Sequence, residues 1–379
     1  MTMPTSEQNP APVAAPDSPE AAKPTTLELK LSASPSFARL LAQHRLSLLV
    51  TTYQAGKLII LRAAGESLNA HFVQANRAMG VAANPARIAV GTAHRIEQFY
   101  NIPAVCAKLP QSDPPQPTHD ACYVPRHSHV TGHIDVHEMA FGGDELWFVN
   151  TRFSCLCTVD PAYSFAPRWR PPFVKALSGD DRCHLNGLAM LNDSPGYVTA
   201  FAVNDEPEGW RPQRTTGGIL MEVASGEIMV RGMSMPHSPR LYGNELFVLE
   251  SGRGTLARVD RRNGSLDTVA DFSGFTRGLD FSGNLAFVGL SQVRQSNIFG
   301  GLPLTDRLRE EERFCGIQVL NLATGQREAF LKFESGVQEI FAVQVLRGIR
   351  YPTILEDDDP LVKSSYTLSE EALTQVRKD

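Results

Sequence analysis

Histidine is the residue type whose distribution in this chain of 379 residues first suggests chemistry. A neutral imidazole accepts protons near neutral pH and is a common ligand of transition metals in proteins. Of the ten histidines, five lie in one segment, namely His119, His127, His129, His133 and His137. Which histidines can act together depends on the strands that position them.

A short alternating run that begins with a polar residue recurs six times along the chain. Most copies continue into a tight turn with Gly or Asn and then into a second apolar run. This pattern is typical of a β-hairpin, because Gly and Asn accept the positive φ that the turn requires. The regular repeat predicts a set of antiparallel blades. The copies begin at Arg77, His137, Asn186, His237, Arg277 and Gln338.

The two ends of the repeat complement each other. The run at 46–52 has no inner strand before it, and the run at 338–346 has no second strand after it. Pairing these ends would close a ring and remove the open sheet edge. We therefore predict an all-β fold, a six-bladed β-propeller closed by N- and C-terminal strands. A β-sandwich or two stacked β domains is the alternative. The expected boundaries are a disordered leader over 1–35, the propeller over 36–350 and a polar C-terminal tail over 351–379.

In a propeller, the starts of the inner strands and the ends of the second strands share one rim of the central channel. His137, His184 and His237 come from three consecutive repeats and are expected at this rim. Three imidazoles that converge suit a divalent transition metal such as Zn, Fe or Cu. The alternative is that these histidines form hydrogen bonds within a polar channel.

The same rim is expected to hold other polar groups. Tyr123 is a candidate general acid, and Asp205 or Glu339 a candidate general base. Arg277 would hold an anionic part of the substrate, and the surplus of arginines favours an anionic ligand. The segment 122–137 could be a lid or a solvated loop, and Trp210 could stack on a ligand or pack beneath its loop. The candidate substrate-binding residues are Arg77, Arg152, Asn186, Trp210, Arg211, Arg253 and Arg294.

Composition narrows the class of partner. The formal net charge of −5 argues against a general binder of nucleic acids or anionic membranes. The sequence shows neither an apolar run long enough for a membrane helix nor a secretory signal. The six cysteines form no CxxC pair, which favours a reduced, cytoplasmic protein.

Several motifs make the chain resemble an uncharacterised bacterial family of conserved hypothetical proteins. They are YVPR at 123–126, DRCHLNGLA at 181–189, SMPHSPR at 234–240, GFTRGL at 274–279 and FVGLS at 287–291. The resemblance covers about 38–352 and implies one continuous domain, but no settled activity. More loosely, the three histidines with Arg277 and Tyr123 are similar in kind to the zinc site of six-bladed propeller metalloenzymes such as the peptidylglycine amidating lyase. A likeness of site type does not by itself carry function.

Three functional hypotheses remain at this point. The first is a metal-dependent lyase, hydrolase or oxidase that acts on a small anionic or peptide-like substrate. The second is a non-catalytic propeller that binds a peptide, a glycan or a protein partner at the same rim. The third is a lyase that uses histidine and tyrosine side chains as acid and base without a metal.

Overall fold

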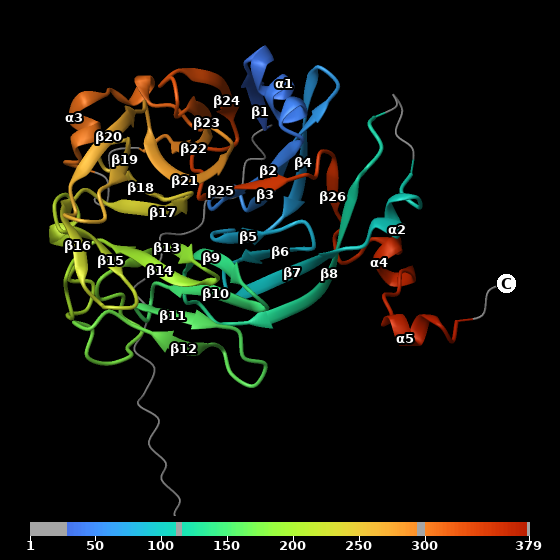
Figure 1. Cartoon of the computed structure of the whole chain (residues 1–379), viewed down its shortest axis with the longest axis horizontal. Helices are drawn as coiled ribbons and strands as arrows, with labels where there is room; N and C mark the ends of the chain where they lie inside the picture. The colour runs from blue at the N-terminus through green and yellow to red at the C-terminus, as the bar shows by residue number, and fades with distance from the viewer. Residues whose placement is uncertain (1–28, 111–115, 294–299, 377–379) are drawn as a thin grey trace, which may run out of the picture.

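The computed structural model describes residues 29–110, 116–293 and 300–376 (Figure 1). Residues 1–28 of the expected leader, and the candidate Arg294, lie outside this part of the chain. Within it, six sheets, antiparallel except for one outer strand of blade two, are arranged around a common centre, and consecutive inner strands contact each other around a closed ring. The predicted six-bladed β-propeller is confirmed.

The blades are given from the channel outward. Blade one contains β25 (Ala342–Arg347), β2 (Leu46–Thr52), β3 (Lys57–Ala64) and β4 (Ser67–Gln74). Blade two contains β5 (Val81–Ala83), β6 (Arg87–Gly91), β7 (Arg95–Asn101), β8 (Ala121–Val130) and β26 (Pro352–Ile354). Blade three contains β9 (Val136–Gly142), β10 (Glu145–Asn150), β11 (Cys155–Thr158) and β12 (Ala166–Trp169).

The second half of the ring follows the same plan. Blade four contains β13 (Leu185–Leu191), β14 (Ser194–Ala200), β15 (Gly218–Glu222) and β16 (Ile228–Met233). Blade five contains β17 (Pro236–Tyr242), β18 (Glu245–Glu250), β19 (Thr255–Val259) and β20 (Leu266–Asp271). Blade six contains β21 (Phe275–Ser282), β22 (Leu285–Ser291), β23 (Gly316–Asn321), β24 (Arg327–Ser335) and β1 (Lys30–Ala33).

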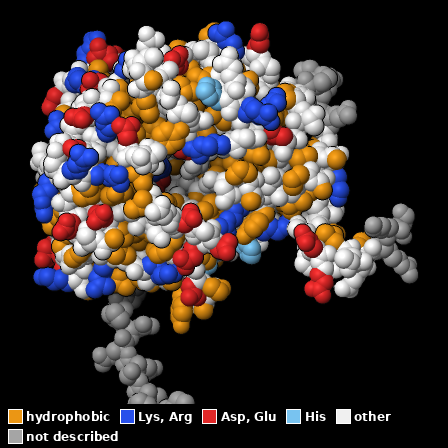
Figure 2. All heavy atoms as spheres, viewed as in Figure 1, with side chains coloured by type: hydrophobic (Ala, Val, Ile, Leu, Met, Phe, Trp, Pro, Cys, Tyr) orange, Lys and Arg blue, Asp and Glu red, His pale blue; other side chains and the backbone are white. Residues whose placement is uncertain are grey.

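Short helices lie outside the blades. The α-helices are α1 (Pro35–Gln43), α2 (Pro103–Cys106), α3 (Pro303–Arg307), α4 (Pro360–Ser364) and α5 (Glu370–Leu373), and the 3₁₀ turns are η1 (Arg211–Gln213) and η2 (Glu310–Glu312). No helix in the described ranges has the length and apolar character needed to cross a bilayer. Positive and negative side chains are interspersed over the face seen in Figure 2, as on an ordinary solvated surface.

Ring closure follows the complementary ends of the sequence. Strand β25 pairs antiparallel with β2 in a continuous register from Leu46 opposite Arg347 to Thr51 opposite Ala342. The first blade is thereby built from both ends of the propeller. The closing strands bury almost every side chain, so that opening the ring would expose both an apolar surface and unpaired backbone groups.

The expected boundary of the leader needs correction. Residues 30–33 are not disordered but form β1, which pairs antiparallel with β24 at the outer edge of blade six. Leu29, Leu31 and Ala33 alternate along this segment and pack against the core that includes Phe37 of α1. A period of two was present in the sequence, and burial of these side chains offsets the cost of ordering the strand.

The expected C-terminal boundary also cuts through an element of the fold. Strand β26 pairs in parallel with β8, so that blade two gains a fifth strand after residue 351. Thr353 and Ile354 are buried there. The tail is therefore part of the propeller at its beginning and continues into α4 and α5 beyond it.

The segment proposed as a lid is mostly a strand. Residues 121–130 form β8, which pairs with β7 along the outer part of blade two. Only the short remainder up to residue 135 connects β8 to the inner strand β9. The segment was too long for a simple loop because it contains β8, the fourth strand of blade two counted from the channel.

Hydroxyl groups join neighbouring blades at the channel rim. Each lies at the end of a second strand and donates to a carbonyl at the start of the next inner strand. Among the described residues, the four such bonds run from Thr51 to Met79 (2.5 Å), Thr151 to Leu185 (2.6 Å), Ser251 to Thr276 (2.5 Å) and Ser291 to Ile340 (3.1 Å). These bonds hold the loops that carry the candidate site.

Candidate functional site

The three predicted histidines meet at one mouth of the channel. The ring centre of His137 lies 5.0 Å from that of His184 and 6.3 Å from that of His237. His137 and His237 are the second residues of β9 and β17, and His184 immediately precedes β13. The convergence expected from the repeat is therefore present in the fold.

The hydrogen bonds of His137 define its tautomer. The Thr151 hydroxyl donates to the Leu185 carbonyl, so it accepts from Nδ1–H of His137 at 2.8 Å. Nε2 then carries the lone pair, and Nη2 of Arg277 donates to it at 2.9 Å. Because β9 and β21 belong to opposite blades, this contact crosses the channel.

His237 is held in the same way. The Ser251 hydroxyl donates to the Thr276 carbonyl and accepts from Nδ1–H of His237 at 2.8 Å. The Met235 carbonyl lies 3.0 Å from the same nitrogen. Nε2 of His237 has no hydrogen-bond partner among the described residues, so its lone pair is available to a ligand.

His184 is anchored by a carboxylate. Its Nδ1 lies 2.7 Å from Oδ2 of Asp181, and Nε1 of Trp210 donates to the same oxygen at 2.9 Å. Asp181 and His184 both adopt positive φ, at 48° and 53°. Such conformations are costly for residues with a side chain and occur often at functional sites.

Asp181 is the site residue that sequence reasoning missed. The spacing Asp-x-x-His at 181–184 was visible, but the repeat placed this segment in a connection and gave no reason to select the carboxylate. Its Oδ1 is buried and has no hydrogen-bond partner in the described ranges. A carboxylate on Nδ1 fixes the orientation of an imidazole and strengthens it as a base or as a ligand.

Arg277 supplies the buried positive charge of the site. Its Nη1 lies 3.0 Å from Oε1 of Glu339, and its guanidinium lies 3.5 Å from the centre of the Phe341 ring. Nε is buried and has no partner among the described residues. The next residue, Gly278, has a φ of 83°, and a Cβ there would lie 2.5 Å from the Val343 nitrogen. This close approach of β21 to β25 brings Arg277 beside Glu339 and Phe341.

Burial and charge keep the central histidines neutral. Burial lowers the pKa of His137 and His237 well below the ordinary 6.5, and the charge on Arg277 lowers both pKa values further. Burial also lowers the pKa of Arg277 to about 10, which leaves it protonated at neutral pH. The mouth therefore combines neutral imidazoles with one buried cation.

Side chains also fill the channel next to the histidines. Glu138 on β9 and Arg240 on β17 form an ion pair of 2.8 Å, in which Glu138 is buried and Arg240 is partly buried. Asp280 on β21 accepts from Gln344 at 2.6 Å and from Arg347 at 2.9 Å. The first contact joins blades three and five, and the contacts of Asp280 join the neighbouring blades six and one.

The predicted metal shell is not assembled in this arrangement. Among the described residues, no group of three or more His, Cys, Asp and Glu side chains is placed to hold a metal ion. The Arg277 guanidinium occupies the His137 lone pair that a metal would need. The observed site is a hydrogen-bonded cluster, while binding of Zn, Fe or Cu stays a prediction.

Of the other candidates, Tyr123 lies apart from this cluster, and Asp205 and Asn186 already have hydrogen-bond partners within the protein. Tyr123 is buried in an apolar core, and its hydroxyl donates to the Pro85 carbonyl at the far end of blade two. Burial raises the pKa of Tyr123, which opposes its ionisation. Asp205 pairs with Arg182 at 2.8 Å, and that bond lowers the pKa of Asp205. Asn186 accepts from Thr199 and donates to the His184 carbonyl.

The outlying arginines and Trp210 lie around the rim. Arg77 donates to the Tyr53 hydroxyl, and Arg253 pairs with Glu250 at 3.1 Å. Arg211 pairs with Glu208 at 2.9 Å and lies 4.7 Å from the centre of the Trp210 ring.

Trp210 is itself 3% exposed and packs 4.3 Å from the His184 ring. It therefore supports a histidine and does not present a free stacking face. The side chain of Arg152 has no hydrogen-bond or ion-pair partner among the described residues.

The fold and this site define a six-bladed β-propeller with a polar, histidine-lined channel mouth. The chain belongs to the family described as Domain of unknown function (DUF4915), whose model matches residues 35–355. This match agrees with the resemblance to an uncharacterised family seen in the sequence.

Among solved structures, the crystal structure of a nidogen/laminin complex contains a similar chain. The TM-score is 0.51 at 8% identity, and the similarity covers 80% of this chain and 99% of that one. At this identity the likeness supports the fold alone. No curated protein matches the chain significantly.

Proposed function

We propose that this propeller is an enzyme whose channel mouth binds a small anionic substrate and transfers protons through neutral histidines. The observation that carries the proposal is the shared orientation of the imidazoles. Each of the three has its Nδ1 within hydrogen-bond distance of a fixed oxygen acceptor. Such anchoring leaves Nε2 as the atom that can accept a proton or bind a ligand.

Arg277 is the proposed anion-binding group. A guanidinium has five N–H donors, and the contacts with Glu339 and His137 use only two of them. Its Nε–H is buried without a described partner, which is costly unless a ligand accepts that bond. A carboxylate that bridges Nε and one terminal nitrogen would satisfy it in a bidentate arrangement.

His237 and His184 are the proposed proton-transfer groups. The charge on Arg277 acts on the His237 ring, so a carboxylate bound by Arg277 would lie near the free Nε2 of His237. His184 has the stronger anchor because Asp181 stabilises the imidazolium that forms when the ring accepts a proton. Removal of a proton next to a bound carboxylate, as in a lyase, is the reaction that this arrangement favours.

A metal-dependent version of the same enzyme is the second candidate. The observation in its favour is again the anchored Nδ1 atoms, since metal-binding histidines usually donate their other ring N–H to such acceptors. Binding of Zn, Fe or Cu to all three Nε2 atoms would require Arg277 to release His137. Elemental analysis of purified protein separates the two versions: a stoichiometric metal that is lost in His184→Ala and His237→Ala supports the second.

A binding experiment tests the anion site itself. Thermal-shift assays with acetate, malonate, succinate, pyruvate, phosphate and sulfate should raise the melting temperature for at least one anion. In calorimetry, Arg277→Met and His237→Asn should weaken that anion at least tenfold. Arg253→Met, at a rim arginine paired with Glu250, is the matched control and should bind normally.

The outcomes discriminate among the hypotheses. If none of these anions binds, or if Arg277→Met binds them as well as the wild type, the anion site does not exist. Conversion of the bound anion, followed by proton NMR, supports the enzyme. Binding without any conversion supports the alternative of a non-catalytic binding propeller.

A further inference from the structure

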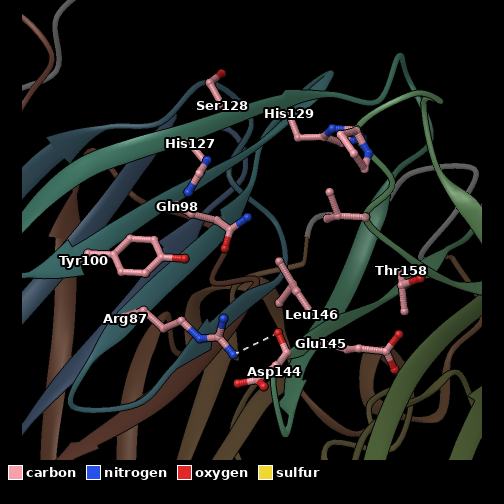
Figure 3. A pocket seen from close by; sticks show the side chains of 12 residues that line it. Arg87, Gln98, Tyr100, His127, Ser128, His129, Asp144, Glu145, Leu146 and Thr158 are labelled. Atoms are coloured by element: carbon pink, nitrogen blue, oxygen red, sulfur yellow. Dashed lines mark hydrogen bonds between the residues drawn. The ribbon is translucent and has the colours of Figure 1, made fainter. Parts of the chain in front are cut away.

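A polar cleft lies between blades two and three, separate from the channel mouth (Figure 3). Its volume is about 540 Å³, within the range of about 300–1,000 Å³ typical of small-molecule sites. One wall is formed by β6, β7 and β8, and the other by the β9–β10 turn with β11 and the residues that follow it. None of the histidines or arginines of the channel mouth lines it.

The register of the strands explains why polar side chains gather on this wall. Arg87 is paired with Tyr100, and Gln98 with His127, so the four side chains share one face of the sheet. Two residues further along β6, the same face carries Ala89 in the apolar core between the two blades. The face thus changes from apolar to polar along the strand toward the cleft.

Several polar groups in the cleft have no hydrogen-bond partner in the part of the chain that the structure describes. The Gln98 amide, the Tyr100 hydroxyl and the Asp144 carboxylate form no hydrogen bond with other described residues. The Arg87 side chain donates to the Gly143 and Asp144 carbonyls, at 3.1 and 3.3 Å, and lies 4.1 Å from the centre of the Phe141 ring. A held guanidinium and free amide, hydroxyl and carboxylate groups therefore face the cleft together (Figure 3).

The charged lining residues are Arg87, Asp144 and Glu145. Arg168, which does not line the cleft, is paired with Glu145 at 2.7 Å and offsets its charge, which leaves one positive and one negative group facing the cleft. Opposite charges of equal number give little advantage to a charged ligand, whereas donors on one wall and acceptors on the other suit ligand groups that both accept and donate hydrogen bonds. Hydroxyl groups have this property, since each donates one hydrogen bond and accepts two.

An aromatic ring completes the lining. Tyr100 extends into the cleft with its hydroxyl toward the open space (Figure 3). The ring of His127 lies 5.7 Å away in an edge-on arrangement, which supports the Tyr100 ring in position. A fixed aromatic face offers an apolar contact to a ligand that is otherwise polar.

We propose that this cleft binds a neutral saccharide. Sugar hydroxyls would donate to Asp144 and accept from Arg87 and Tyr100, while the C–H face of the pyranose ring packs on Tyr100. The free amide of Gln98 would pair with a further hydroxyl. The inference rests on the cleft alone and does not depend on the proposed reaction at the channel mouth.

Saccharide binding to the full chain tests this proposal. The probes are glucose, galactose, mannose and N-acetylglucosamine in calorimetry, and an immobilised panel of neutral oligosaccharides. We expect binding to at least one probe, and Tyr100→Ala should weaken it about tenfold. Asp144→Asn, a change at an exposed turn that leaves the blade packing intact, should weaken it by a similar factor.

Controls separate the cleft from other surfaces. Tyr366→Ala removes a tyrosine that is 83% exposed on the tail, and Glu66→Gln removes a carboxylate from the exposed β3–β4 turn of blade one. Both should bind normally, as should His237→Asn, which alters only the channel mouth. Binding to monosaccharides indicates a free sugar as ligand, and binding only to oligosaccharides indicates a chain end. If no probe binds, or if Tyr100→Ala and Asp144→Asn bind like the wild type, the proposal is overturned.

Discussion

Acid should destabilise this propeller through two residues of its channel mouth, His137 and His237. Both rings are buried, and burial together with the charge on Arg277 lowers their pKa values well below 6.5 in the folded protein. In the unfolded chain the same histidines have ordinary pKa values near 6.5. Below that pH the unfolded state binds more protons than the folded state, so stability is lost as the pH falls.

The size of the effect follows from linkage. Between pH 7 and pH 5, a histidine that stays neutral in the folded state and titrates normally in the unfolded state contributes about 2 kcal/mol. The two histidines together therefore account for about 4 kcal/mol of lost stability. This is a large part of the roughly 5–15 kcal/mol by which folded domains are stable.

Urea unfolding at pH 7 and pH 5 measures this loss directly. The variants His137→Asn and His237→Asn keep a side-chain N–H close to the position of Nδ1, so the bonds to Thr151 and Ser251 can re-form. We expect the loss of stability between the two pH values to shrink by about 2 kcal/mol in each variant and by about 4 kcal/mol in the double variant. His127→Asn, at an exposed position on β8, is the matched control and should show the wild-type loss.

Two results would refute the reasoning. One is an equal loss of stability in the wild type and the double variant, which would mean that the two histidines bind protons equally in both states. The other is a wild type that is more stable at pH 5 than at pH 7. That sign would require folded-state pKa values above 6.5 and a carboxylate partner that neither ring has in this structure.

Three further predictions concern the support of the site. Thr151→Val removes the bond to Leu185 and leaves Nδ1–H of His137 unpaired, so chemical denaturation should show a loss of about 1–3 kcal/mol, whereas Thr151→Ser should show little loss. Asp181→Asn removes the carboxylate that holds Nδ1–H of His184, so nitrogen NMR should show the His184 tautomer becoming mixed while His237 stays unchanged; an unaltered His184 would contradict the assigned anchor. Compared with a chain that lacks residues 1–28, a chain that lacks residues 1–34 has lost β1 and should be less stable by about 1–2 kcal/mol through the lost partial burial of Leu31; equal stability of the two shortened chains would show that β1 contributes nothing.

The sequence was most informative where the repeat was regular. The polar residue that opens each inner strand is followed by an alternating apolar run and a turn, and this pattern depends on local backbone requirements. The pairing of β25 with β2 followed from the repeat, because the first run of the chain lacked an inner strand and the last inner strand lacked a second strand. Prediction failed at β1, β8 and β26, which are outer strands with weaker apolar alternation, because their pairing depends on contacts distant in sequence.

The candidate site was predictable in part for the same reason. His137 and His237 occupy equivalent positions in their repeats, so their convergence followed from the fold. Tyr123 was placed at the rim by analogy with a lid, but the structure buries it in an apolar core. Asp205 was placed there as a strand end, and the structure pairs it with Arg182. Asp181 was passed over because its importance comes from a bond to His184 that requires two residues in left-handed backbone conformation.

The sequence by itself determined the number of blades, the way the ring closes and which histidines share a rim, because these follow from periodicity and from the need to pair every strand edge. Only the tertiary structure decided what the histidines do with their nitrogens. Thr151 and Ser251 lie in the same blades as their histidines, and Asp181 lies three residues before His184. The two hydroxyls accept from Nδ1–H because each donates to a carbonyl of the next blade, and that bond forms only when the blades pack. Arg277 meets His137 across the full width of the channel. Contacts of this kind depend on the distance between opposite blades, and no local pattern in the sequence encodes that distance.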